Sequence, residues 1–126
     1  MKSITRQKPF EEVQRLLEGL DRVFIIGCGT CTTMTRTGGR EEVQEMKERL
    51  QGLGKLVTGW TVVPTACDEM AEAILLESDG ALKSASCILE MACALGVHRS
   101  SIHADKPVIP ALDTLFIGME DGLGEF

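Results

Sequence analysis

Apolar residues recur along this chain at two spacings, and the spacing separates the predicted helices from the predicted strands. Over residues 9–19 they fall three or four positions apart, which is the period of one face of a helix, and Pro9 suits the first helical turn. The same period runs through residues 40–54, where Gly54 is a plausible stop. We therefore predict amphipathic helices over both ranges.

Short unbroken runs of apolar and β-branched residues form the second pattern. Residues 22–27 (RVFIIG) and 55–64 (KLVTGWTVVP) are of this kind and are bounded by turn-forming residues. Within the run SCILEMAC (86–93), residues 87–92 are predicted as a third strand because they continue the alternation of helix and strand. Residues 106–112 (KPVIPAL) are predicted as a brief fourth strand, which the prolines restrict to a sheet edge or a strand start.

Three further segments have weaker patterns. Residues 67–85 begin with acidic side chains, which suits the amino terminus of a helix, but Asp79-Gly80 indicates a break or a kink. Residues 96–104 are predicted to form a short helix or an irregular crossover. Residues 113–126 are predicted to be a tail whose apolar side chains dock and whose glycines fray.

Helices that alternate with strands predict a mostly parallel sheet, and right-handed crossovers place its strands side by side in one direction. With 126 residues and 44% apolar side chains, the chain is long enough for one core and too short for two ordinary domains. We predict that residues 1–126 form a single α/β domain. Its expected architecture is a three-layer, Rossmann-like or flavodoxin-like open parallel sheet of about four strands with helices on both faces.

Composition narrows the classes of function. A net charge of −6 leaves no broad basic surface, so we expect no nucleic-acid partner. The apolar runs are far shorter than the roughly 18 residues of a membrane span, and no secretory signal is evident, so we expect no membrane partner and a cytoplasmic location. Five cysteines, an odd number without the spacing of a secreted disulfide scaffold, favour reduced thiols, a metal site or redox chemistry.

Four of these cysteines follow predicted strands. Cys28 and Cys31 form a glycine-flanked Cys-x-x-Cys loop after the first strand, Cys67 follows the second and Cys93 follows the third. In an open parallel sheet, ligands bind beyond the carboxyl ends of the strands, which meet at one edge. We therefore expect all four sulfurs at that edge, where they match the ligand count of a tetrahedral zinc site or an iron–sulfur cluster.

Other interpretations of the same residues stay open. A Cys-x-x-Cys pair after a strand also occurs in thioredoxin-type dithiol enzymes, although here the eight residues TTMTRTGG separate the motif from the next helix. Cys87 lies inside the predicted third strand, where a cysteine is most often a small buried apolar residue. His98 and His103 are weak ligand candidates. Asp113 is expected to cap a turn after the fourth strand rather than to orient a ligand.

Four segments together resemble one family: TRQKPFEEV, VFIIGCGTCTTMTRTGGREEV, VTGWTVVPTACDE and DKPVIPALDTLFIG. They are similar to the methylenetetrahydrofolate reductase C-terminal domain family, whose free-standing members are the small MetV-type subunits of acetogenic and other anaerobic bacteria. The resemblance extends from about Thr5 to Gly118. It implies an iron–sulfur accessory subunit, with zinc as an alternative or additional metal. Such a subunit pairs with the flavin-bearing catalytic subunit and handles electrons for the reduction of methylenetetrahydrofolate.

The resemblance also assigns residues. The cysteines that match the family, and that it implies as ligands of a [4Fe-4S] cluster, are Cys28, Cys31, Cys67 and Cys93. The glycines that match its loop are Gly27, Gly29, Gly38 and Gly39. We predict that these glycines line the cofactor and that their backbone N–H groups donate hydrogen bonds to sulfur.

The chain departs from the family at two places. A further cysteine commonly stands where this chain has Thr35, and family members often continue into a cysteine-rich tail, whereas this sequence ends at Phe126. We therefore expect a single metal centre, with Cys67 supplying the ligand that Thr35 does not. The predicted docking surface for the partner consists of Trp60 and residues 115–119.

Overall fold

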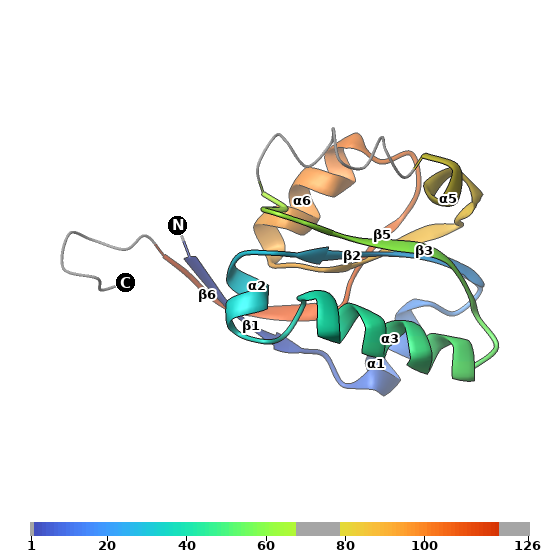
Figure 1. Ribbon diagram of the computed structural model, residues 1–126, viewed down its shortest axis with the longest axis horizontal. Helices are drawn as coiled ribbons and strands as arrows, with labels where there is room; N and C mark the ends of the chain where they lie inside the picture. The colour runs from blue at the N-terminus through green and yellow to red at the C-terminus, as the bar shows by residue number, and fades with distance from the viewer. Residues whose placement is uncertain (1, 68–78, 119–126) are drawn as a thin grey trace.

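Four parallel strands form the main sheet of the protein, whose computed structural model describes residues 2–67 and 79–118. The strands lie in the order β3-β2-β4-β5. Figure 1 shows this sheet with helices above and below it. They are β2 (Arg22–Cys28), β3 (Leu56–Val63), β4 (Cys87–Met91) and β5 (Val108–Pro110). All four predicted strands are confirmed, and the proline-bearing β5 lies at the edge of the sheet, where a missing N–H is tolerated.

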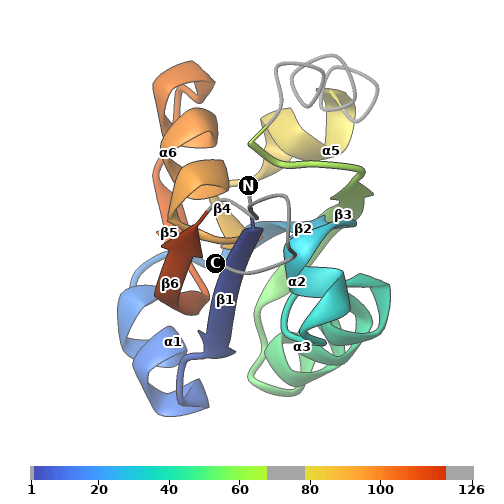
Figure 2. The same ribbon diagram turned by 90° about the vertical axis from the view of Figure 1, so that its left-hand side faces the viewer.

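Helices cover both faces of this sheet. One face carries α1 (Phe10–Leu16) and α3 (Arg40–Gly52), and the other carries α5 (Asp79–Ser84) and α6 (Ala94–His103) (Figure 2). The three layers confirm the predicted α/β fold class, a Rossmann-like or flavodoxin-like open parallel sheet with helices on both faces. None of the helices in the described ranges is both long and apolar enough to cross a membrane.

The structure answers part of what the weaker sequence patterns left open. Residues 96–104, predicted as a short helix or an irregular crossover, fall almost entirely within the regular helix α6. The helix predicted over residues 67–85 is observed as α5 at its carboxyl-terminal end, while residues 68–78 lie outside the described residues.

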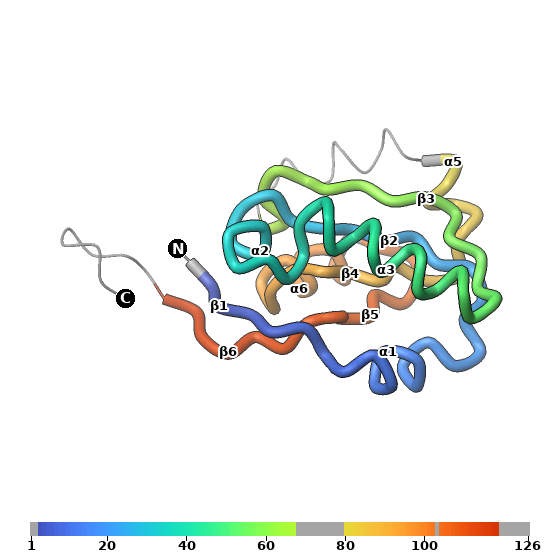
Figure 3. The backbone as a smooth tube through the Cα atoms, turned by 60° about the horizontal axis from the view of Figure 1, so that its bottom comes forward, coloured from blue at the N-terminus to red at the C-terminus, as the bar shows by residue number. Residues whose placement is uncertain are grey.

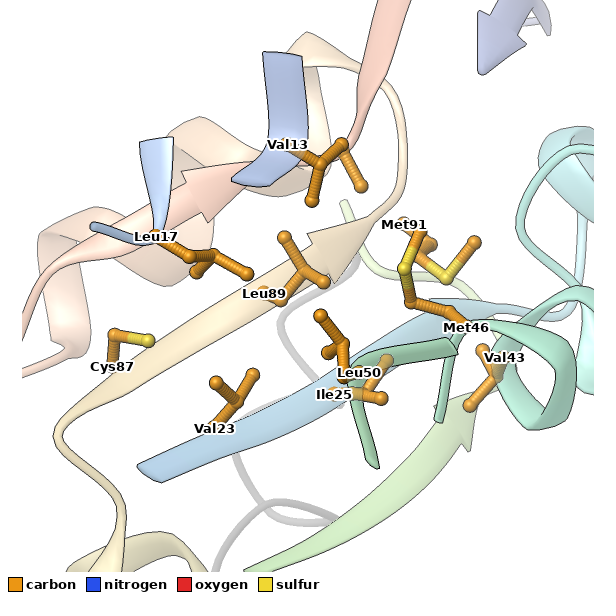
Figure 4. Packing of buried hydrophobic residues seen from close by; sticks show 11 residues of the cluster. Val13, Leu17, Val23, Ile25, Val43, Met46, Leu50, Cys87, Leu89 and Met91 are labelled. Atoms are coloured by element: carbon orange, nitrogen blue, oxygen red, sulfur yellow. The ribbon is translucent and has the colours of Figure 1, made fainter. Parts of the chain in front are cut away.

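The central strand β2 is buried on both faces, and its side chains alternate between two apolar clusters. Val23 and Ile25 belong to the cluster beneath α1 and α3 (Figure 4). Phe24 and Ile26 belong to the cluster on the opposite face, beneath α5 and α6. Because both faces are apolar, the strand needs no alternation of polar and apolar residues, and its unbroken run was sufficient to predict it.

The end of α3 follows the predicted glycine stop. Gly54 has a φ of +84°, in the left-handed region that glycine adopts at low cost. Its N–H donates to the carbonyl of Gln51 at 3.0 Å, and the N–H of Lys55 donates to the carbonyl of Leu50 at 3.1 Å, which closes a Schellman motif. The ammonium of Lys55 then donates to two backbone carbonyls just after α1, so one residue ties together the ends of two helices.

A second sheet of two antiparallel strands corrects the prediction for the tail. Strand β6 (Leu112–Gly118) pairs with β1 (Lys2–Gln7), and the ribbon they form extends past the main sheet (Figure 3). Its pattern is inverted relative to an ordinary surface strand, because Ser3 and Thr5 are buried while Ile4 is 40% exposed. Hydrophobic periodicity alone therefore gave no signal for β1.

Asp113 does not cap a turn, as the sequence had suggested, but forms ion pairs from within β6. Its Oδ1 accepts from the ammonium of Lys8 at 2.5 Å, and its Oδ2 lies 3.6 Å from the guanidinium of Arg6. The hydrogen bond from Lys8 is the main reason why the pKa of Asp113 is lowered. The carboxylate thus fastens the ribbon to the segment that leads into α1.

Candidate thiol site

Four cysteines lie at the carboxyl-terminal edge of the main sheet, which faces the viewer in Figure 2. Cys28 is the last residue of β2, and Cys31 is the first residue of the short helix α2 (Cys31–Met34). The motif therefore runs directly into a helix, and the expectation that TTMTRTGG separates it from the next helix was wrong. Cys67 and Cys93 follow the ends of β3 and β4. The chain leaves β2 toward β3 on one side and later returns to β4 on the other side, so this edge contains the topological switch point at which open α/β sheets bind ligands.

Cys28 is the most enclosed of these thiols. Its side chain is 7% exposed and belongs to the apolar cluster beneath α5 and α6. The backbone N–H of Ala66 lies 3.5 Å from its Sγ and donates to it. A backbone N–H that donates to sulfur is the kind of hydrogen bond that supports a cysteine ligand in a metal site.

Cys67 shows that the four sulfurs share one electrostatic environment. Desolvation of its thiol is the main cause of a raised pKa for Cys67, and the nearby thiols of Cys93, Cys28 and Cys31 raise it further. These contributions require that all three groups lie near the Cys67 sulfur, since a charge on one thiol opposes a charge on its neighbour.

Cys93 is placed by the start of helix α6, of which it is the N-cap residue. The helix approaches the loop of Cys67 closely because Gly96 has no side chain. A Cβ added to Gly96 would lie 2.8 Å from the Cβ of Ala66, the residue before Cys67. This close approach brings the amino terminus of α6 to the loop that follows β3.

Threonine hydroxyls hold the Cys-x-x-Cys loop to the neighbouring strand ends. Thr30 donates to the carbonyl of Pro64, just after β3, at 2.5 Å. Thr32 donates to the carbonyl of Met91, at the end of β4, at 3.3 Å. Thr37 joins the loop to β1 through a hydroxyl–hydroxyl contact of 2.6 Å with Thr5. The threonine-rich run was visible in the sequence, but its role as a set of clamps was not predicted.

Thr35, the position of the family's additional cysteine, belongs to the same hydroxyl network. Its Oγ1 donates to the carbonyl of Cys31 at 3.1 Å and lies 2.9 Å from the hydroxyl of Thr37. The side chain thus has a structural function in the loop, which links it to β1.

The glycines of the loop serve close packing, and their amides are engaged within the protein. A Cβ on Gly38 would lie 1.9 Å from the carbonyl oxygen of Met91, and one on Gly27 would lie 2.5 Å from the carbonyl oxygen of Gly38. The N–H groups of Gly29 and Gly39 donate to Val63 and Glu42. Gly38 donates to the carbonyl of Thr32. Our expectation that glycine amides donate to sulfur is thus not met for Gly29, Gly38 or Gly39, and Ala66 provides a bond of that kind instead.

The remaining candidates lie apart from the four thiols. Cys87 is fully buried in the cluster beneath α1 and α3, at the opposite end of β4 from Met91 (Figure 4), as expected for a packing residue. His98 is exposed and borders a hollow of about 430 Å³ together with Lys8 and Asp113. The side chain of His103 lies outside the described residues.

The donors at this edge fit a thiolate-bound metal centre in kind and in number. Four cysteine sulfurs are the ligand set of [4Fe-4S] clusters and of some structural zinc sites. Zinc requires sulfurs about 3.8 Å apart, from a Zn–S distance of about 2.3 Å in tetrahedral geometry. In the described parts of the chain, no three Cys, His, Asp or Glu side chains are gathered closely enough to hold a metal ion. The thiols therefore form a loose group that a bound centre would have to draw together.

Fold and site together define an α/β protein with a group of four thiols at its switch point. No family model matches the chain, and no curated protein or solved structure matches it. The resemblance to the methylenetetrahydrofolate reductase C-terminal domain family therefore stays a prediction.

Proposed function

We propose that this protein binds an iron–sulfur cluster through Cys28, Cys31, Cys67 and Cys93 and acts as an electron-transfer accessory subunit in the cytoplasm. One observation carries the proposal: the ends of three neighbouring parallel strands bring Cys28, Cys31, Cys67 and Cys93 to one edge of the sheet, at its switch point. A bound cluster would supply one-electron transfer.

The residues of the chain would hold such a centre rather than perform organic chemistry. The N–H of Ala66 supports charge on the Cys28 sulfur. The threonine clamps fix the Cys-x-x-Cys loop against the ends of β3 and β4. Cys93, as N-cap of α6, lies where the helix dipole favours a negative charge.

A cluster fits the loose spacing of the thiols better than a single zinc ion does. Several irons separate the thiolates in a cluster, so it needs a wider ring of sulfurs than the roughly 3.8 Å spacing of zinc. A dithiol enzyme fits less well, because the nucleophile of such an enzyme must be accessible and Cys28 is 7% exposed.

The partner that the family resemblance implies is the flavin-bearing subunit of a methylenetetrahydrofolate reductase. The ribbon of β1 and β6 is a suitable docking surface, since Leu115, Phe116 and Ile117 are partly exposed. The hydroxyl of Thr114 in β6 accepts the N–H of Ala94 at 2.9 Å, which fixes the ribbon next to Cys93. Trp60 is less suitable, because it is partly buried against the core and lies beneath the guanidinium of Arg40.

Metal analysis of the chain purified without oxygen tests the proposal. We expect a brown protein with about four irons and four sulfides per chain. Cys67→Ser should lose most of this iron, whereas the matched control Cys87→Ser, altered on the opposite face of the sheet, should keep it.

Three results would contradict the proposal in different ways. Unchanged iron in Cys67→Ser would show that the ligand set is wrong. A colourless protein with one zinc per chain would indicate a structural zinc domain. A metal-free protein with a reversible disulfide between Cys28 and Cys31 would indicate a dithiol oxidoreductase. The partnership is tested separately by pull-down with the flavin subunit, where Leu115→Glu should abolish capture if the ribbon is the docking surface.

A further inference from the structure

The carboxyl group of Glu90 has no part in the proposed metal site, yet it lies beneath the helix that carries Cys93. Glu90 is in β4, is fully buried, and faces α6. The hydroxyl of Ser100 in α6 donates to its Oε1 at 2.6 Å. Among the described residues, its Oε2 has no hydrogen-bond partner. A carboxylate at this position would lose its hydration, and only one of its two oxygens would accept a hydrogen bond. Burial of such a charged group is energetically unfavourable.

Helix α6 is attached to the sheet mainly through small residues. Within the described residues, no large, fully buried apolar side chain comes from α6. Its buried positions are Gly96 and Ser100. Because Leu95 and Val97 are only half-buried and no large apolar side chain in the described part of α6 is fully buried, its local opening should cost less than global unfolding. The hydrogen bond from Ser100 to Glu90 is then a substantial part of what keeps α6 docked.

We propose that Glu90 is a proton-controlled latch, which keeps α6 docked while its carboxyl group is protonated and releases the helix when the proton passes to solvent. Release allows water to reach the carboxylate, which removes the cost of its burial. Since Cys93 is the N-cap of α6, the same movement separates it from the other three thiols.

The latch acts in the neutral pH range. Burial raises the pKa of Glu90 to about 7, and the hydrogen bond from Ser100 opposes this rise. The titratable residues on the elements around it are Arg22 and Cys28 on β2 and His98, Arg99 and His103 on α6. Strand β5 (Val108–Pro110) contributes none. No charged group in the described residues contributes to the shift, so the latch depends on burial and on one hydroxyl.

The consequence for metal binding rests on the proposed function, whereas the movement of α6 does not. Rising pH normally favours thiolate ligation, because protons leave the sulfurs. The latch acts in the opposite direction, since opening of α6 removes one ligand. A metal-loaded wild-type protein should therefore lose metal to a chelator faster at pH 8.5 than at pH 6, and Glu90→Gln should not.

Alkylation of Cys93 by iodoacetamide in the reduced, metal-free full chain tests the movement itself. At each pH, the rate is divided by the rate for the same residue in the urea-unfolded chain, which cancels the ordinary ionisation of the thiol. With a docked pKa of about 7 and an ordinary value of 4.5, the opening constant should rise about tenfold between pH 6 and pH 8.5. The ratio should stay flat in Glu90→Gln and should rise as in wild type in the control Glu48→Gln, which alters an exposed residue of α3.

A second variant keeps the proposal open to refutation if Glu90→Gln does not fold. Ser100→Ala removes the hydroxyl that favours the carboxylate and so raises the docked pKa of Glu90 further, and the alkylation ratio should level off at higher pH than in wild type. A flat ratio in wild type, an equal rise in Glu90→Gln, or a ratio that levels off at the same pH in Ser100→Ala and wild type would each overturn the latch. Because the metal is absent from this assay, failure of the chain to bind iron would contradict only the proposed function.

Discussion

Replacement of Glu90 by glutamine should change how the stability of the protein depends on pH. Glutamine has nearly the same shape as glutamic acid and can accept the hydroxyl of Ser100 through its amide oxygen, but it does not ionise. The folded protein raises the pKa of Glu90 from 4.5 to about 7, because burial disfavours the charged form. Between these two values, the folded state binds a proton that the unfolded state releases.

The magnitude follows from the size of this shift. Stability contributed by the protonated carboxyl is complete below pH 4.5 and is lost as the pH rises through 7. The rise of the pKa from 4.5 to about 7 corresponds to roughly 3 kcal/mol, and most of this free energy is lost between pH 5 and pH 8. Opening of α6 limits the loss, because the carboxylate can be hydrated without global unfolding. The unfolding free energy should therefore stop falling at high pH, and the size of the total fall measures the free energy that holds α6 on the sheet.

Urea unfolding followed by circular dichroism at several pH values between 5 and 8.5 provides the assay. The difference in unfolding free energy between Glu90→Gln and wild type should shift in favour of glutamine by up to about 2.5 kcal/mol over this range. A constant offset between the two proteins carries no information, since it reflects packing of the amide. Parallel profiles for wild type and Glu90→Gln would refute the reasoning, and Glu48→Gln should follow wild type throughout.

Three further substitutions test how the site is assembled, each by urea unfolding. Gly38→Ala should destabilise the protein by about 3 kcal/mol or more, because the new Cβ would lie 1.9 Å from the carbonyl oxygen of Met91; a loss below 1 kcal/mol would show that the loop moves freely. Gly54→Ala should cost about 1 kcal/mol, since its φ of +84° is strained for alanine, whereas the control Gly52→Ala, inside α3 with open space around it, should be neutral or stabilising. Lys55→Met should cost about 1 to 3 kcal/mol by leaving two carbonyls near the end of α1 without their donor, and an unchanged midpoint would indicate that water replaces the ammonium.

The main sheet was predictable because burial on both faces leaves a direct trace in the sequence. The unbroken apolar run of β2 and the glycine stop at Gly54 each have one dominant physical cause. The ribbon of β1 and β6 was not predictable in this way. Ser3 and Thr5 face inward and Ile4 faces outward, so polarity and burial are reversed. The hydroxyl of Thr5 is buried because it pairs with that of Thr37, which is distant in sequence.

The candidate site was also predictable only in part: the placement of its cysteines followed from the topology, but its backbone contacts did not. Cysteines after successive parallel strands must lie at one edge of the sheet, so topology alone placed them together. Contacts made by the backbone leave no such trace, and the donation from the N–H of Ala66 to the Cys28 sulfur depends on the path of the loop after β3. The requirement for glycine at position 96 could not be predicted from the sequence either. It arises because α6 packs so closely against Ala66 that a side chain at position 96 would collide with it.

The sequence contained a sign of the unusual role of Glu90 that our sequence analysis did not use. A single acidic residue interrupts the apolar strand β4, and every residue of that strand is buried. A leucine or methionine there would satisfy the packing and would avoid a dehydrated carboxyl group, so stability does not explain the glutamate. Its oxygen is bonded to the helix that begins at Cys93, and its unmet oxygen makes that attachment sensitive to one proton. If the glutamate serves closure of the thiol site, Glu90→Met should stabilise the fold at pH 8 and abolish the pH response of Cys93, two effects that a purely structural residue would not link.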